Sequence, residues 1–335
     1  MTDTDINKDH LHHAYFCHRR LGFIGSAVVP ELLQAGHQVV GLARSDASAE
    51  AVAAAGAAVL RGELADLDVL RAGATASDGV IHLGFIHDFA NFAAAAATDR
   101  LAIEALGTVL EGSNRPLVVA SGLLGLTPGR VATERDAPAA HSNGIASLRQ
   151  AGVRTALSFV SRGVRTIMVR FAPTVHDAGD HGFIPRVIAI AREKGVSGYI
   201  GDGSNRWPAV HRLDAARLVR LAVEAAPAGS ALHAVGDEGV PIRDVAELIG
   251  RKLNVPLVSI APEDAGEHFG WIGGFFGTDS PASNALTREW LGWEPTHPGL
   301  IEDLEQGHYF QLQHGGAGAN ASRPDASSLR GAPSS

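Results

Sequence analysis

Short apolar segments that alternate with helical segments constrain the fold of this 335-residue chain more than any other feature. Apolar stretches of strand length occur at 38–43, 58–60, 79–83, 115–121 and 165–170. Helical patterns lie before or between them at 22–36, 47–55, 90–110 and 147–161. Because strands joined through helices pair in parallel and are covered on both faces, this order predicts an α/β fold. We expect a Rossmann-type doubly wound parallel sheet.

The alternation changes after about residue 178, which predicts a second, smaller unit. Helices are predicted at 184–194, 214–225 and 242–253, with a strand at 232–235 and a polar, glycine-rich loop at 201–207. We therefore assign 13–178 to the Rossmann domain, with 208–236 returning to it, and 179–207 with 237–310 to a smaller C-terminal substrate lobe. Residues 1–12 are predicted to be disordered or mistranslated, and residues 311–335, rich in Gly, Ala, Ser and Pro, to form a disordered tail.

Composition excludes several classes of partner. The net charge is −8 and no basic run is interleaved with aromatic residues, which argues against nucleic acid. No stretch of about 20 apolar residues predicts a membrane span, and the charged first 20 residues are unlike a secretory signal. The single cysteine, Cys17, fits a reducing cytoplasm. The 16 histidines include no His-Glu-x-x-His pair, so we predict no metal site. For partners, we expect a small-molecule substrate and a monomer or homodimer.

Topology alone predicts where a ligand binds. In open parallel sheets, ligands bind beyond the carboxyl ends of the strands. This rule selects the loops that follow residues 43, 83, 121 and 170.

Five sequence motifs occur in an order and spacing that resemble a known superfamily. They are Gly22-Phe-Ile-Gly25, Gly62-Glu-Leu-Ala-Asp66, Val80-Ile-His-Leu-Gly84, Val169-Arg-Phe-Ala-Pro173 continuing to His176, and Gly201-Asp-Gly203 with Val210-His211 and Asp214-Ala215. Over about residues 13–310 the chain resembles the short-chain dehydrogenase/reductase superfamily, in its extended or atypical branch of NAD-dependent epimerases and dehydratases. The resemblance implies a dinucleotide cofactor held at the first strand–helix turn.

The cofactor-binding residues follow from these motifs. The expected set is Gly22, Phe23, Ile24, Gly25, Arg44, Glu63, Leu64, Leu83 and Gly84. Glycines let the backbone approach the pyrophosphate, which then sits on a helix N-terminus. An acidic residue at the end of the second strand would bind the ribose hydroxyls, whereas an arginine accepts a 2′-phosphate. Because Arg44 stands there, we predict NADP as the preferred cofactor and NAD as the alternative. A solvated loop position for Arg44 is the other interpretation.

The chain departs from the family at the cofactor loop. Aligned on Gly25, the first motif glycine falls on Arg19, and 13–20 is polar and aromatic where a Val/Ile strand belongs. An arginine there would project into the pyrophosphate site, so the loop as written predicts poor dinucleotide binding. If the codons for residues 13–22 are read one base later, they can encode Met-Arg-Ile-Ser-Val-Thr-Gly-Ala-Ser-Gly, which contains the missing strand and the full glycine motif. We hypothesise a frameshift or sequence error before residue 22, with a natural start near His13, which resequencing the gene would test.

A second departure lies in the active site. The family uses Tyr-x-x-x-Lys on the helix after the fifth strand and a serine at that strand's end, where the lysine lowers the tyrosine pKa for proton transfer. Ser121 occupies the serine place, but the three tyrosines, at 15, 199 and 309, are elsewhere. Counting back from Arg162 puts the lysine near Arg149 and the tyrosine near Ile145. We predict Ser121, His141 and Arg149 as catalytic residues, with a solvated loop as the alternative place of His141.

The leading functional hypothesis is an NAD(P)-dependent oxidoreductase or epimerase-like enzyme that acts on a small polar substrate. The missing tyrosine favours the alternative, a non-catalytic NAD(P)-binding sensor, and the unusual N-terminus allows a third, the defective product of a disrupted gene. Trp271, Phe275 and Phe276 are expected to line the substrate cleft or to form the core of the smaller lobe.

Overall fold

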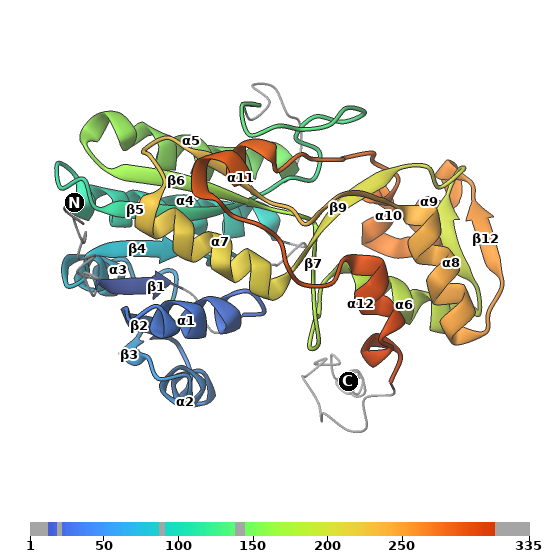
Figure 1. The fold of residues 1–335 in the computed structure, drawn as a ribbon, viewed down its shortest axis with the longest axis horizontal. Coiled ribbons are helices and arrows are strands. Elements are labelled where there is room, and N and C mark those ends of the chain that lie inside the picture. Colours follow the sequence, from blue (N-terminus) through green and yellow to red (C-terminus); the bar gives the residue numbers. More distant parts are fainter. Residues whose placement is uncertain (1–12, 19–21, 87–90, 138–144, 312–335) are drawn as a thin grey trace, which may run out of the picture.

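The computed structural model describes residues 13–18, 22–86, 91–137 and 145–311, and it divides into a larger and a smaller lobe (Figure 1). The larger lobe is built on seven strands: β1 (Ala14–His18), β2 (Gln38–Ala43), β3 (Ala58–Arg61), β4 (Gly79–His82), β5 (Pro116–Gly122), β6 (Arg165–Phe171) and β10 (Ala231–Ala234). Its helices are α1 (Gly25–Gln34), α2 (Asp46–Ala54), α3 (Leu67–Thr75), α4 (Phe92–Leu110), α5 (Ile145–Ser158), the short η1 (Val160–Arg162) and α7 (Arg212–Ala225).

The strands of the larger lobe form one parallel sheet in the order β10-β6-β5-β4-β1-β2-β3. The chain runs outward from the central β1 to β3 and then crosses back to place β4 on the other side of β1. This reversal is a topological switch point between β1 and β4, where doubly wound sheets bind their ligands. The predicted α/β, Rossmann-type doubly wound sheet with a smaller C-terminal lobe is confirmed.

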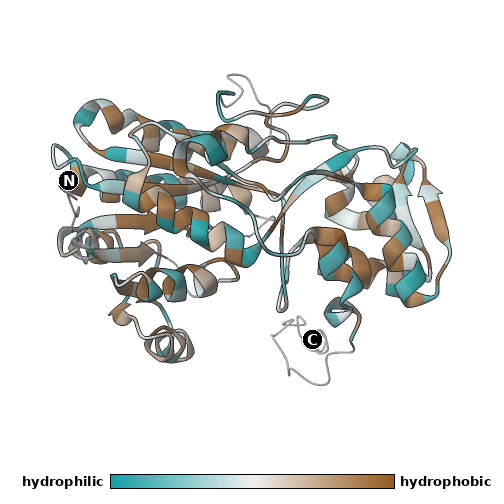
Figure 2. Ribbon diagram, viewed as in Figure 1, coloured by the Kyte–Doolittle hydropathy of each residue, from teal (hydrophilic) through white to brown (hydrophobic). Residues whose placement is uncertain are grey.

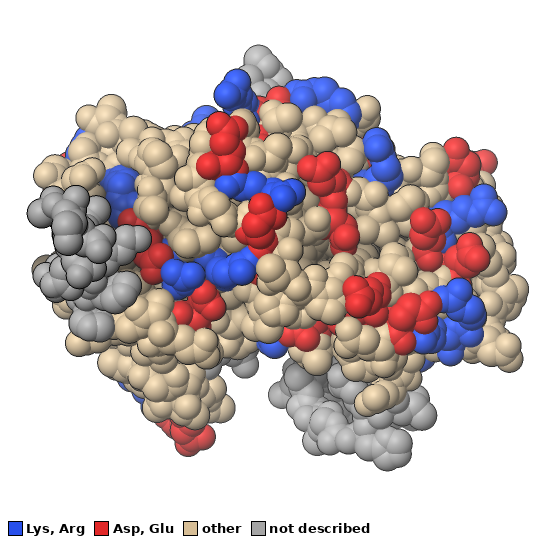
Figure 3. Space-filling model, viewed as in Figure 1, with Lys and Arg blue, Asp and Glu red and all other residues tan. Residues whose placement is uncertain are grey.

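Two apolar layers cover the sheet. Helices α1, α2 and α7 pack on one face, and α3, α4 and α5 pack on the other. In Figure 2 the strands between these layers are predominantly hydrophobic, while polar residues lie on the outer faces of the helices. Acidic and basic side chains are interspersed on the face drawn in Figure 3, and neither sign forms a continuous band there.

Strand β1 corrects the expectation that its sequence is unsuited to a central strand. Tyr15 and Cys17 are buried in the layer beneath α1, and Phe16 is buried in the opposite layer. Because neighbouring side chains of a strand point to opposite faces, aromatic rings here fill the space that Val and Ile would occupy. Burial raises the pKa of the Cys17 thiol to about 12, so the thiol stays protonated at neutral pH.

The smaller lobe has its own apolar core and two small sheets, β11-β9-β7 and β12-β8. Its strands are β7 (Thr174–His176), β8 (Ser197–Ile200), β9 (Arg206–His211), β11 (Asp237–Pro241) and β12 (Leu257–Ile260). Its helices are α6 (Phe183–Lys194), α8 (Ile242–Leu253), α9 (Ala265–Phe269), α10 (Gly273–Phe276), α12 (Leu300–Glu305) and the short η2 (Pro262–Asp264), η3 (Gly270–Ile272) and η4 (His308–Phe310). Helix α11 (Ala285–Leu291) instead contacts α7 and β10 of the larger lobe.

The described residues contain neither a membrane-spanning helix nor a metal-binding cluster. No helix among them is long and apolar enough to cross a membrane. Within the same ranges, no group of three or more His, Cys, Asp or Glu side chains has a geometry that could hold a metal ion. Residues 1–12, predicted to be disordered or mistranslated, and the predicted tail 311–335 beyond Gln311 lie outside the described ranges.

Candidate functional site

The predicted cofactor residues gather at the carboxyl edge of the large sheet. The Gly22–Gly25 turn follows β1, and helix α1 starts within it, where the Ser26 N–H donates to the Gly22 carbonyl at 2.8 Å. Leu83 and Gly84 follow β4 on the other side of the switch point, and both are buried. The turn and the end of β4 therefore flank the position at which this fold binds a dinucleotide.

Arg44 lies where the cofactor hypothesis requires it, between β2 and α2. Its neighbour Ser45 caps α2, because the Ser45 hydroxyl accepts a hydrogen bond from the Ser48 N–H at 3.3 Å. The cap fixes the point at which the chain leaves the sheet edge, and the Arg44 side chain is exposed there. The position suits contact with a ribose or a 2′-phosphate, and the preference for NADP stays a prediction.

The segment Gly62–Asp66 after β3 is a turn held by a hydrogen bond between a side chain and the backbone. The Asp66 carboxylate accepts a hydrogen bond from the Glu63 N–H at 2.9 Å. Gly62 has a φ of +155°, and a Cβ there would lie 2.8 Å from the Val69 side chain, so a larger residue would displace α3. The turn holds Leu64 half-buried and leaves the Glu63 side chain exposed at the same edge of the sheet.

These residues fit a dinucleotide. A glycine turn at the switch point leads directly into a helix N-terminus, which is the arrangement that binds a pyrophosphate. Arg19, at the first motif glycine, lies outside the described residues. Its predicted steric conflict and the frameshift hypothesis therefore stay predictions.

Two of the three predicted catalytic residues lie together. Ser121 is near the end of β5 and is 8% exposed. Arg149, on α5, donates from Nη2 to the carbonyl of Ala120 at 3.4 Å, and its guanidinium carbon lies 3.8 Å from the centre of the Phe85 ring. The structure thus places a fixed positive charge beside the strand end that carries Ser121, as the count from Arg162 predicts. His141 lies outside the described residues.

Sequence reasoning missed Phe85, which follows Leu83 and Gly84 directly. Its ring forms a platform for Arg149 and also contacts Phe92 at the start of α4, with ring centres 5.3 Å apart. A cation above an aromatic face is stabilised and held in place. An aromatic residue immediately after the family's strand motif was the available signal, but its partner lies 64 residues away.

A buried polar cluster supports the segment that follows β5. Glu134 accepts hydrogen bonds from the Thr287 N–H and hydroxyl at 2.7 and 2.8 Å, and Arg170 on β6 lies with one guanidinium nitrogen 3.3 Å from His233 Nε2. Arg170 also donates to the Asp136 carbonyl at 2.8 Å. Burial lowers the pKa of His233 to about 4, so this imidazole is neutral at pH 7. The part of the carboxyl edge that carries Ser121 and Arg149, named the catalytic edge, therefore rests on buried charged and polar groups.

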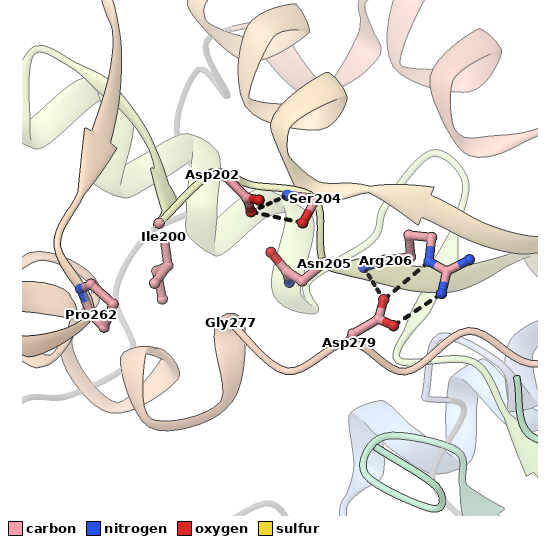
Figure 4. Close-up of a pocket in the computed structure, with 9 residues that line it drawn as sticks. Ile200, Asp202, Ser204, Asn205, Arg206, Pro262, Gly277 and Asp279 are labelled. Carbon is pink, nitrogen blue, oxygen red and sulfur yellow. Dashed lines mark hydrogen bonds and ion pairs between the residues drawn. The ribbon is translucent and has the colours of Figure 1, made fainter. Parts of the chain in front are cut away.

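A polar pocket opens in the smaller lobe between the 200–206 loop and the segment around residue 279 (Figure 4). Arg206 forms a two-pronged ion pair with Asp279 at 3.1 and 3.0 Å, and the Asp202 carboxylate accepts from the Ser204 N–H and hydroxyl. Hydrogen bonds from Arg206 hold the pKa of Asp279 below its usual range. The segment that follows β5 reaches one wall of this pocket, because the Gly129 N–H donates to the Asp279 carbonyl at 3.1 Å.

The aromatic segment of the smaller lobe divides between core and surface. Phe276 is 3% exposed and belongs to the core. Phe275 is partly buried against Phe183 and Trp207, with ring centres 5.5 and 6.2 Å away, and Trp271 is 46% exposed at the edge of this cluster. The core interpretation holds for Phe276, and a contact of Trp271 with substrate stays a prediction.

Comparisons with known proteins agree with this geometry. Residues 21–235 match the model of the NAD dependent epimerase/dehydratase family. The chain is 48% identical over 291 residues to the uncharacterized protein C2A9.02 of Schizosaccharomyces pombe, covering 86% of this chain and 97% of that protein. It is 47% identical over 285 residues to the uncharacterized protein YLL056C of Saccharomyces cerevisiae, covering 84% and 95%.

Solved structures share the fold at low sequence identity. The dTDP-glucose 4,6-dehydratase DesIV from Streptomyces venezuelae, with NAD and TYD bound, superposes with a TM-score of 0.71 at 18% identity, covering 88% of this chain and 95% of that one. The UDP-glucose 4-epimerase from Thermotoga maritima, with UDP-glucose, gives 0.70 at 19% identity, covering 89% and 98%. At these identities the likeness shows the fold alone.

Proposed function

The chain belongs to the NAD dependent epimerase/dehydratase family, and from this premise we propose that it is an NAD(P)-dependent oxidoreductase or epimerase-like enzyme acting on a small polar, sugar-like substrate. One observation carries the proposal: the Gly22–Gly25 turn, Ser121 and Arg149 all lie at the carboxyl edge of the same sheet. Cofactor-binding and catalytic groups that meet at one edge are what a hydride-transfer site requires.

Each side chain has a distinct role in this proposal. When bound, NAD(P) supplies the hydride donor or acceptor. The Ser121 hydroxyl holds the reacting oxygen of the substrate. Arg149 stays charged at neutral pH and cannot pass a proton, so it replaces the family lysine only as a fixed positive charge. Proton transfer therefore falls to His141, whose ordinary pKa of about 6.5 suits it.

The polar pocket supports a hydroxyl-bearing substrate. Its one arginine, Arg206, is already paired with Asp279, and Asp202 adds a second carboxylate. Carboxylates accept hydrogen bonds from hydroxyl groups, whereas they repel phosphate. The Thermotoga maritima structure named above holds UDP-glucose. In this chain we propose a sugar-like group without a requirement for the diphosphate.

The cofactor assignment has two levels. The family is NAD-dependent, and we propose NAD(P) binding at the switch point. Preference for NADP depends on Arg44 alone.

The absent Tyr-x-x-x-Lys pair favours one rival function, a non-catalytic NAD(P)-binding sensor. None of the three tyrosines lies on α5: Tyr15 is in β1, Tyr199 in β8 and Tyr309 in η4. A sensor would bind cofactor without turning over a substrate.

A turnover screen distinguishes the two functions. NADPH and NADH oxidation would be followed with a panel of sugar aldehydes and ketones, for the wild type, Ser121→Ala and a control, Ser161→Ala. Ser161 is exposed in η1, and its hydroxyl donates to the Ser158 carbonyl at 3.1 Å. An enzyme predicts that Ser121→Ala lowers turnover by roughly 10²-fold or more, while the control is unchanged. Cofactor binding without turnover on any member of the panel would favour the sensor.

A further inference from the structure

The cofactor turn is contacted by an arginine from the second half of the chain. Arg212, the first residue of α7, places its guanidinium carbon 4.8 Å from the centre of the Phe23 ring. Its Nη1 lies 3.4 Å from the hydroxyl of Ser26, which in turn donates to the Phe23 carbonyl at 2.9 Å. One side chain therefore touches both the glycine turn and the first turn of α1.

Arg212 is itself anchored to the smaller lobe. Its Nη2 donates to the Asp177 carboxylate at 2.8 Å, and Asp177 follows strand β7. Asp177 is held in addition by Tyr309, whose hydroxyl accepts from the Asp177 N–H at 3.3 Å, and its second carboxylate oxygen lies 3.7 Å from His211 Nε2. These contacts fix the guanidinium in one orientation.

The loop that carries Asp177 also contacts Phe23 directly. The His181 ring meets the Phe23 ring edge-to-face, with centres 5.9 Å apart. Phe23 therefore contacts one group from α7 and one from the loop that leads into α6. An arginine suits this position better than a lysine, because its planar fork pairs with a carboxylate while its face stacks on an aromatic ring.

We propose that Arg212 is a positioning residue for the cofactor: it holds the Phe23–Ser26 turn against the smaller lobe, so that the N-terminus of α1 is oriented for the pyrophosphate before cofactor binds. The inference rests on the proposed dinucleotide site. Its physical basis is that a helix N-terminus binds a phosphate through backbone N–H groups, whose directions depend on the preceding turn. A turn held in place in advance also loses less conformational entropy on binding.

The chain offers a matched control for this contact. Arg220, eight residues further along α7, also joins α7 to α1, since its Nε donates to Glu31 at 2.7 Å. The side chains of Arg212 and Arg220 are both 23% exposed. Arg220 lies about 12 Å along the helix from Arg212 at 1.5 Å per residue, and its partner Glu31 is near the other end of α1. Arg220→Ala therefore measures the effect of losing an α1–α7 ion pair that does not contact the turn.

Two measurements test the proposal on the full chain. The first is titration of the wild type, Arg212→Ala, Arg212→Lys and Arg220→Ala with NAD, NADP and ADP-ribose, all of which carry the pyrophosphate. We expect Arg212→Ala to weaken binding of each ligand by about tenfold, the size of one charge-assisted contact. Arg212→Lys should recover part of this loss, and Arg220→Ala should bind within about twofold of the wild type. Equal losses in the two alanine variants would overturn the proposal, because the effect would then be general helix packing.

The second measurement is amide hydrogen exchange without cofactor, at residues 24–28, where the Ser26 and Val28 N–H groups are bonded within the turn and helix. Faster exchange in Arg212→Ala alone supports positioning, and unchanged exchange overturns it even if affinity falls, since Arg212 would then act by direct contact with the cofactor. If the wild type binds none of the ligands, the proposed function fails, and exchange still decides whether Arg212 holds the turn.

Discussion

The carboxyl edge of the large sheet has two parts that are built in different ways: the cofactor edge, at Gly22–Gly25 and Gly62–Asp66, and the catalytic edge, at Ser121 and Arg149. The cofactor edge consists of turns defined by backbone geometry, at Gly22–Gly25 and at Gly62–Asp66. The catalytic edge depends on the identity of side chains, with Ser121 and Arg149 in place but no tyrosine on α5. Glycine motifs therefore predict the place of the cofactor edge, whereas no motif predicts the acid/base of the catalytic edge.

The two edges also rest on different supports. Helix α1 behind the cofactor turn buries Val28, Val29 and Leu32 against the sheet. The segment after β5 instead rests on the buried Glu134 and on Arg170 with His233. Apolar burial does not change with pH, whereas buried titratable groups do. Acid should therefore weaken the support of the catalytic edge first.

The largest effect should come from the acid/base. We expect His141→Ala to lower turnover by roughly 10²–10⁴-fold with cofactor affinity nearly unchanged, because His141 would carry the proton that the missing tyrosine carries elsewhere. Steady-state kinetics and a cofactor titration would measure this. The control is His13→Ala, at the amino end of β1 on the opposite edge of the sheet. If His141→Ala keeps full activity on a substrate for which Ser121→Ala abolishes turnover, His141 is not the acid/base.

The next effect concerns stability in acid. An unfolded histidine binds a proton below about pH 6.5, whereas His233 in the folded chain resists protonation until about pH 4. Between these values the unfolded state holds more protons, so stability is full above pH 6.5 and falls as the pH drops toward 4. The loss of unfolding free energy between pH 7 and pH 4.5 should be roughly 2 kcal/mol, measured by urea unfolding at the two pH values. A His233→Gln variant should lose less stability between these pH values, and an equal loss would remove His233 as the cause.

The smallest effect concerns the choice between NADP and NAD. If Arg44 binds a 2′-phosphate, Arg44→Asp should shift the preference from NADP toward NAD by about tenfold, or 1.4 kcal/mol. Binding titrations with both cofactors would show it. Arg61→Ala is a control, because Arg61 ends the neighbouring strand β3 and is paired with Asp46 at 2.6 Å. An unchanged NADP-to-NAD ratio in Arg44→Asp would place Arg44 outside the site.

The sequence predicts structure best where the determinants are local. Strand β2 and helix α8 have the predicted bounds, because the apolar pattern of each segment begins and ends where the element does. Helix α7 starts at Arg212 rather than Asp214, because the His211 side chain caps it by accepting from the Leu213 N–H. The stacking of Arg149 on Phe85 and of Arg212 on Phe23 could not be predicted, because each contact joins segments that are far apart along the chain.

For strand β1, the local sequence led to the wrong expectation. Its composition argued against a central strand, yet alternation of Tyr15 and Cys17 with Phe16 places large side chains on both faces of the sheet. Position between β2 and β4 decided the outcome, and the β propensity of single residues did not.

Cofactor titration of the wild type and Gly22→Val tests whether the Gly22–Gly25 turn binds the dinucleotide. We predict that the wild type binds NAD or NADP and that Gly22→Val, which places a branched side chain at the pyrophosphate, loses about 2–4 kcal/mol of binding free energy. Gly274→Val, in a position of the smaller lobe where an added Cβ meets no atom within 4 Å, should bind as the wild type does. A dissociation constant unchanged by Gly22→Val would contradict the assignment of the cofactor site.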